Sequence, residues 1–136
     1  MRYLLDTNTL VYALNAQPRH QAILARLERE APQDLFISAI TLAELRYGAA
    51  KSRRRERNLE SVRRVAQALY ISAFDDAAAA AYGDLRAELE RAGTPIGPLD
   101  TLIAAHALSL GMILVTANTR EFTRVRGLRV ESWLPD

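Results

Sequence analysis

Three carboxylic acids stand at or near the predicted starts of helices, and two of them follow a predicted strand. Asp6 ends a short apolar run, Glu44 follows the apolar segment 35–40, and Asp100 comes just after Pro98. Three carboxylates gathered within a few ångströms repel each other, and each resists ionising unless a cation neutralises the set. Oxygen ligands without cysteine or histidine are typical of Mg²⁺ sites, with Mn²⁺ as the alternative. The acids therefore predict an open magnesium site, provided that the fold brings them together.

Each acid taken alone also has a purely structural interpretation. Asp6 is a suitable N-cap for a following helix. Thr41 and Glu44 have the spacing of a capping box. Asp100 is favourably placed for the dipole of a helix that begins at Pro98. These interpretations explain the residues one at a time, but they do not explain why acids recur at successive strand–helix junctions.

The elements that would position these acids alternate between strand and helix. Apolar, β-branched segments predict strands at 2–5, 35–40, 70–74, 112–116 and 128–133. Helical periodicity and capping signals predict helices at 9–14, 20–31, 41–50, 53–69, 75–92, 99–111 and 119–122. This alternation predicts an α/β fold, with a small central parallel sheet of about 4–5 strands flanked by helices on both faces. Ligands bind at the carboxyl edge of such a sheet, where the three acids and Asn118 are expected to converge.

Composition limits the class of protein further. The 136 residues predict one domain over 1–136, and 49% apolar with 25% charged residues is typical of a globular chain. No apolar run approaches the roughly 18 residues that span a bilayer, and Asp6 interrupts any secretory signal. The absence of cysteine excludes disulfides and thiolate metal sites. We therefore expect a cytoplasmic protein with no membrane partner.

The basic residues are almost all arginines. Lys51 is the only lysine among 18 basic residues, and the formal net charge is +2. Arginine suits bidentate contacts with phosphate, although a GC-rich genome produces the same bias. The segment 51–57 is strongly basic, and a second basic region contains Arg120, Arg124, Arg126 and Arg129. Such runs often form only solvated helix faces. Beside a magnesium site they point to hydrolysis of a phosphodiester polyanion.

Four segments together resemble the PIN-domain ribonucleases, specifically the VapC-type toxins of bacterial toxin–antitoxin pairs. They are YLLDTN, ISAITLAEL, PIGPLDTLIAAHAL and LVTANTREFTRVRGLRVESW, and the resemblance extends from residue 2 to about residue 133. It implies a PIN domain with a magnesium-dependent endoribonuclease activity. It also implies a homodimer that is inhibited by a cognate VapB-like antitoxin, whose tail lies across the acids.

At matching positions the resemblance implies roles for individual residues. Asp6, Glu44 and Asp100 correspond to the catalytic, metal-binding acids. Residues expected to orient these acids or a metal-bound water are Thr7, Asn8, Ser38, Thr116 and Asn118. Asn118 stands where many members carry a fourth acid, and this substitution leaves the number of metal ions open. If Asp6 binds the ion, Thr7 or Asn8 can cap the next helix.

Further contacts with the RNA backbone are expected from exposed basic residues. The candidates are Arg46, Lys51, Arg53, Arg54, Arg55 and Arg120. His106 lies six residues after Asp100, about 240° around the helix, so we expect a packed histidine and not a general base. His20 has no evident partner. Phe122 and Trp133 are expected to pack in or beside the core.

Two other functions compete with the ribonuclease interpretation. The first is a phosphohydrolase of the haloacid dehalogenase type with Asp6 as nucleophile. Against it, Asn8 stands where that chemistry needs a second acid, and Lys51 lies in an exposed basic run. The second is a catalytically inactive module that binds nucleic acid or a protein partner. Loss of an acid would mark such a module, whereas Asp6, Glu44 and Asp100 are all present.

Overall fold

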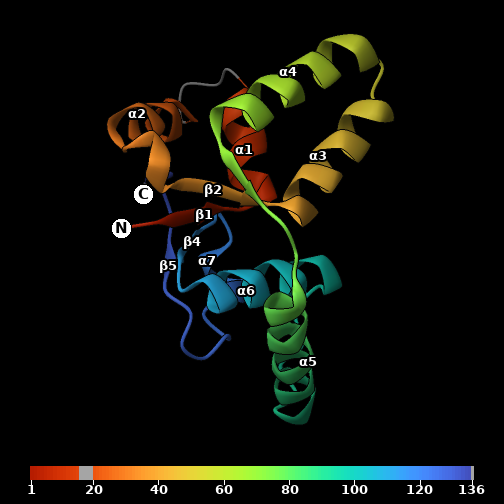
Figure 1. Cartoon of the computed structure of the whole chain (residues 1–136), viewed down its shortest axis with the longest axis vertical. Coiled ribbons are helices and arrows are strands. Elements are labelled where there is room, and N and C mark those ends of the chain that lie inside the picture. Colours follow the sequence, from red (N-terminus) through yellow and green to blue (C-terminus); the bar gives the residue numbers. More distant parts are fainter. Residues whose placement is uncertain (16–19, 136) are drawn as a thin grey trace.

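A five-stranded, entirely parallel sheet forms the centre of the protein (Figure 1). The structure is a computed structural model, and it describes residues 1–15 and 20–135. In sequence order the strands are β1 (Tyr3–Leu5), β2 (Leu35–Ser38), β3 (Tyr70–Ser72), β4 (Ile113–Val115) and β5 (Val130–Glu131). Their spatial order is β3-β2-β1-β4-β5, so β1 is the central strand. The predicted α/β fold with a small parallel sheet is confirmed.

Helices connect the strands and cover both faces of the sheet. They are α1 (Thr7–Leu14), α2 (Gln21–Arg29), α3 (Ala39–Ala50), α4 (Arg55–Ala68), α5 (Asp76–Arg91), α6 (Pro98–Leu110) and α7 (Thr119–Phe122), with a 3₁₀ turn, η2 (Pro32–Asp34), before β2. Side chains alternate between the two faces along a strand. Leu5 accordingly packs in one hydrophobic cluster with residues of α1, α2, α3 and α4, and Leu4 packs in another with residues of α5 and α6.

The second strand is shorter than the predicted segment 35–40. Ser38 ends it, because the Ser38 hydroxyl oxygen accepts a hydrogen bond from the backbone N–H of Ile40 and caps α3. The helix therefore begins at Ala39, and Glu44 lies in its second turn instead of the first turn that the sequence suggests. The last strand is likewise shorter than predicted, since only Val130–Glu131 pairs with β4.

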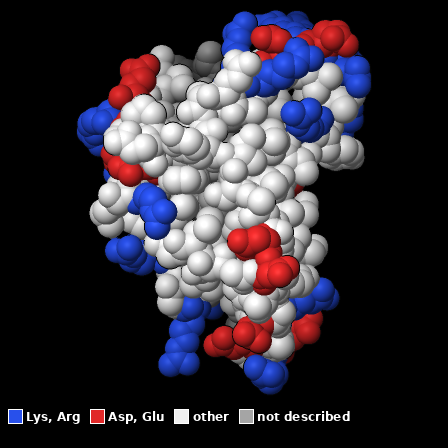
Figure 2. All heavy atoms as spheres, in the orientation of Figure 1, with Lys and Arg blue, Asp and Glu red and all other residues white. Residues whose placement is uncertain are grey.

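The helices α3 and α4 pack against each other and extend away from the sheet; this pair, residues 39–68, is called here the α3–α4 arm (Figure 1). Basic side chains, with some acids among them, gather over the end of the molecule where α4 lies (Figure 2). Within the described residues, no helix is long and apolar enough to cross a membrane.

Candidate active site

Asp6 lies at the carboxyl end of β1, the central strand, and it also caps α1. One carboxylate oxygen, Oδ1, accepts a hydrogen bond of 2.9 Å from the backbone N–H of Thr9, and the other, Oδ2, accepts one of 2.5 Å from the Thr116 hydroxyl. The capping interpretation of Asp6 is therefore correct, and neither Thr7 nor Asn8 caps the helix in this structure. Burial raises the pKa of the Asp6 carboxyl, while the hydrogen bonds from Thr116 and Thr9 oppose this rise.

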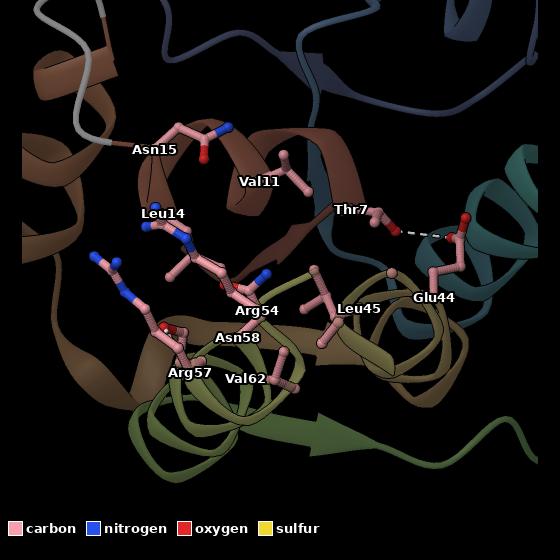
Figure 3. A pocket seen from close by; sticks show the side chains of 13 residues that line it. Thr7, Val11, Leu14, Asn15, Glu44, Leu45, Arg54, Arg57, Asn58 and Val62 are labelled. Atoms are coloured by element: carbon pink, nitrogen blue, oxygen red, sulfur yellow. Dashed lines mark hydrogen bonds between the residues drawn. The ribbon is translucent and has the colours of Figure 1, made fainter. Parts of the chain in front are cut away.

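Glu44 is tied to the first residue of α1. The Thr7 hydroxyl donates a hydrogen bond of 2.8 Å to Glu44 Oε1, so the residue after Asp6 orients a second acid. Thr41 and Glu44 do not form a capping box, because Ser38 is the N-cap of α3. The side chain of Glu44 is therefore directed toward the strand–helix junction that carries Asp6 (Figure 3).

Asp100 lies in the first turn of α6, as predicted, and its environment is dominated by other acids. Burial is the largest cause that raises the pKa of this carboxyl to about 7, followed by the charge of Glu121 and a hydrogen bond with it. The charges of Asp6 and Glu44 raise the pKa further. The fold thus brings the three predicted acids near one another, and it adds a fourth that the sequence interpretation missed.

That fourth acid, Glu121, is held in place by two donors. Its Oε2 accepts a hydrogen bond of 2.6 Å from the Asn118 side-chain amide, and its Oε1 accepts one of 3.0 Å from the backbone N–H of Gly97. Gly97 precedes α6, so Glu121 connects the start of the helix that carries Asp100 to α7. The signal in the sequence was the spacing of Asn118 and Glu121, since residues three apart share a helix face.

The expected supporting residues divide into two groups. The hydroxyls of Thr116 and Thr7 donate hydrogen bonds to Asp6 and Glu44, respectively. The side chain of Asn118 donates to Glu121, and its backbone N–H donates to the Thr116 hydroxyl oxygen. Asn8, by contrast, is exposed. Ser38 is buried, but it bonds His106 and the backbone of α3 and not a carboxylate.

His106 is a packed histidine, as predicted. Its side chain is fully buried, Nδ1 lies 2.8 Å from the Ser38 hydroxyl, and its ring meets Phe74 edge-on. Burial lowers its pKa, so the neutral ring is favoured. Phe122 and Trp133 are also buried, which agrees with the expected packing roles.

The described residues provide no basic partner for any of the four acids. Within residues 1–15 and 20–135, none of them forms an ion pair. Such a donor set suits a hard divalent cation, which would remove the mutual repulsion. In the same ranges, no three His, Asp or Glu side chains are spaced to hold a metal ion as they stand. Binding would therefore require Asp100 to lose its proton and the carboxylates to draw together.

A cluster of acids at the carboxyl edge of a small parallel sheet is the arrangement of the nuclease class that the sequence resembles. The family model of the PIN domain matches residues 3–128 of this chain. A Salmonella typhimurium protein named tRNA(fMet)-specific endonuclease VapC is 44% identical over 133 residues, which are 98% of each chain. Ribonuclease VapC2 of Haemophilus influenzae is 42% identical over 134 residues, 98% of this chain and 99% of that one.

The solved structures agree with these relatives. In the crystal structure of DNA-bound VapBC from Salmonella typhimurium, one chain superposes with a TM-score of 0.92 at 44% identity, and the match covers 98% of both chains. The protein therefore belongs to the PIN-domain family, among the VapC ribonuclease toxins of VapBC toxin–antitoxin systems. The resemblance seen in the sequence is confirmed, and the alternative of a haloacid dehalogenase-type enzyme is excluded.

Proposed function

We propose that this VapC-type endoribonuclease hydrolyses RNA at the carboxyl edge of β1, with Mg²⁺ or Mn²⁺ held by Asp6, Glu44 and Asp100 and assisted by Glu121. The observation that carries the proposal is a cluster of four carboxylates that have no basic partner among the described residues. The charges of Glu121, Asp6 and Glu44 help raise the pKa of Asp100 to about 7. A bound cation would acidify a water and neutralise charge that builds on the scissile phosphate.

The side chains of this chain prepare the site in two ways. Thr116 and Thr9 orient the Asp6 carboxylate, and Thr7 orients Glu44, so these two acids are directed before RNA arrives. The pKa of Asp100 is raised to about 7 by burial and by the neighbouring Glu121, so Asp100 must lose its proton before it can bind a cation as a carboxylate. Because Asn118 donates to Glu121, the amide contributes by orienting an acid instead of supplying a charge.

Basic residues around the acids would hold the RNA backbone. The candidates from the sequence are all exposed: Arg46, Lys51, Arg53, Arg54, Arg55 and Arg120. Because the Salmonella relative is named for cleavage of tRNA(fMet), we propose a transfer RNA in the cytoplasm as the substrate class.

A cognate VapB-like antitoxin is the proposed protein partner. The chain matches the toxin family of VapBC complexes along nearly its whole length. An antitoxin segment that lies across the acids would exclude RNA from them. The homodimer implied by the resemblance remains a prediction.

The test is a cleavage assay on transfer RNA with Mg²⁺, with EDTA, and with the variant Asp6→Asn. We expect cleavage with Mg²⁺ alone, leaving a 3′-hydroxyl and a 5′-phosphate, and its loss in EDTA and in the variant. Cleavage that persists in EDTA, or products that end in a 2′,3′-cyclic phosphate, would instead indicate attack by the ribose hydroxyl and refute the proposal.

A further inference from the structure

A pocket beside the acids is lined by two arginines, Arg54 and Arg57, of which Arg57 has no role assigned above. It lies between α1 and the α3–α4 arm and has a volume of about 560 Å³. Thr7 and Glu44 line one end of it, and Arg54 and Arg57 line the other (Figure 3). The pocket is therefore continuous with the carboxylate cluster through Glu44.

The helices that form the pocket define its length. Along α1 the lining runs from Thr7 to Leu14, which at about 1.5 Å per residue is about 10 Å. Glu44 lies nearer the sheet on α3, whereas Arg54 and Arg57 stand at the start of α4, beyond the end of α3. The arginines are thus displaced from the acids along the pocket, and they do not neutralise them.

Arg54 and Arg57 differ from the other arginines of α4. Arg55 pairs with Glu56, and Arg63 and Arg64 both contact Glu60. In the described part of the chain, Arg54 and Arg57 form no ion pair. Their guanidinium groups extend toward the end of α1 (Figure 3). Two arginines without a counter-charge at one pocket are suited to an oxyanion, above all to phosphate.

The walls of the pocket combine apolar and hydrogen-bonding side chains. Val11 and Leu14 on α1 are 38% and 43% exposed. Polar groups from Asn15, Asn58 and Ser61 lie among them. A single-stranded nucleotide needs this combination, because its ribose and base present apolar faces while its hydroxyls and phosphate take hydrogen bonds.

We propose that this pocket is a second RNA subsite, in which Arg54 and Arg57 bind a backbone phosphate beyond the scissile one and the apolar wall packs against the intervening nucleotide. The inference rests on the proposed ribonuclease function and extends it, since it assigns Arg57 and separates Arg54 from the other basic residues. By binding this phosphate, the subsite would determine which phosphodiester bond of the RNA lies at the acids.

The test compares two double variants that remove the same charge from one helix. Arg54→Ala/Arg57→Ala removes the pocket arginines, and Arg63→Ala/Arg64→Ala removes two arginines outside the pocket. Binding of a labelled tRNA(fMet) transcript is measured in the Asp6→Asn background, and cleavage in the active background. We expect Arg54→Ala/Arg57→Ala to raise the Kd and KM for RNA about tenfold above the wild-type values. Its kcat should stay within about twofold of the wild type.

Salt dependence gives a second, independent readout. For a single strand, the slope of log K against log salt falls by about 0.7 for each phosphate that the protein no longer neutralises. Because Arg54 and Arg57 bind one phosphate, Arg54→Ala/Arg57→Ala should lower this slope by about 0.7, and the Arg63→Ala/Arg64→Ala control should leave it nearly unchanged. Arg54→Lys/Arg57→Lys keeps the charge and should recover most of the affinity, which separates weaker phosphate binding from altered folding.

The outcomes distinguish this inference from the function on which it rests. Equal Kd and salt slope in the two alanine pairs would overturn the subsite, whether or not the protein cleaves RNA. Binding that depends on Arg54 and Arg57, with no cleavage by the wild type, would support the subsite and refute the proposed function. If the pocket pair weakens inhibition by the antitoxin while RNA binding is unchanged, the arginines bind a protein carboxylate, and the subsite is refuted.

Discussion

The acid site has two halves, one around Asp6 and the other around Asp100 and Glu121. They hold their carboxyl groups by different contacts. Asp6 is 3% exposed, and both of its oxygens accept hydrogen bonds, from Thr9 and Thr116. Asp100 is only half-buried, and its hydrogen bond is with another acid, Glu121. The neutral donors of Thr9 and Thr116 hold the Asp6 carboxylate in one orientation and oppose the rise in its pKa that burial causes. A neighbouring acid, in contrast, makes a carboxyl harder to ionise, and Glu121 helps to raise the pKa of Asp100 in this way.

This difference separates a fixed half from an adjustable one. Asp6 is directed in the metal-free protein, because its partners are a backbone amide and a threonine hydroxyl. Asp100, whose pKa is raised to about 7, changes its charge with pH and with any cation that arrives. One half of the site therefore provides geometry, whereas the other half couples protons to cation binding.

The largest effect is expected from removing charge in the fixed half. Asp6→Asn should lower the cleavage rate about 10³-fold or more, because a carboxylate directed at the cation is lost. The amide oxygen can still accept from Thr9, so the fold should be retained. In the adjustable half, Glu121→Gln should cost only about tenfold. Single-turnover rates with Mg²⁺ measure both, and a greater loss in Glu121→Gln would reverse the assignment of the two halves.

The next effect is the pH dependence of cation binding. Asp100 keeps its proton up to about pH 7, and a cation must displace it. Mn²⁺ affinity should therefore fall about tenfold for each pH unit below 7. Titration calorimetry across this range measures it. In Glu121→Gln the fall should begin at lower pH, because a charge that raises the pKa of Asp100 is gone. Affinity independent of pH would show that no proton is exchanged.

A smaller effect is expected from the donor to Asp6. Thr116→Val removes the hydroxyl that bonds Asp6 Oδ2, so the carboxylate becomes harder to ionise and less well directed. We expect kcat to fall about tenfold with KM for RNA unchanged. Thr116→Ser retains the donor and should remain close to the wild type. Steady-state kinetics on the three proteins decides this, and an unchanged kcat in Thr116→Val would show that Asp6 needs no support there.

The smallest effect concerns stability. The pKa of Asp100 is raised in the folded protein, so the folded state binds this proton more tightly, and stability from this group is lost as pH rises through about 7. Metal-free Asp100→Asn should therefore melt a few degrees higher than the wild type at pH 8, about 2–5 °C. The difference should vanish near pH 4 and shrink when Mg²⁺ saturates the wild type. Equal melting temperatures at pH 8 would contradict a raised pKa of Asp100 in the folded protein.

Much of the fold was predictable because its signals are local. Apolar runs that end on a polar residue mark β1, β2 and β4, and helical spacing marks α5 and α6 over nearly their observed bounds. The boundary that failed, at Ser38, depended on a hydroxyl that can either continue a strand or cap a helix. The placement of Asp6 at the carboxyl edge followed from strand–helix alternation, and that of Asp100 from its position at the start of the helix that leads into β4.

The sequence by itself determined a parallel α/β sheet with acids at its carboxyl edge, since alternation and burial are properties of short segments. Tertiary structure alone decided that Glu121 meets Asp100, because that contact joins two elements which are far apart along the chain. It also decided that Arg54 and Arg57 share a pocket with Glu44. Long-range packing determines which charges lie near one another, and these distances determine which carboxylate keeps a proton and which arginine stays free for phosphate.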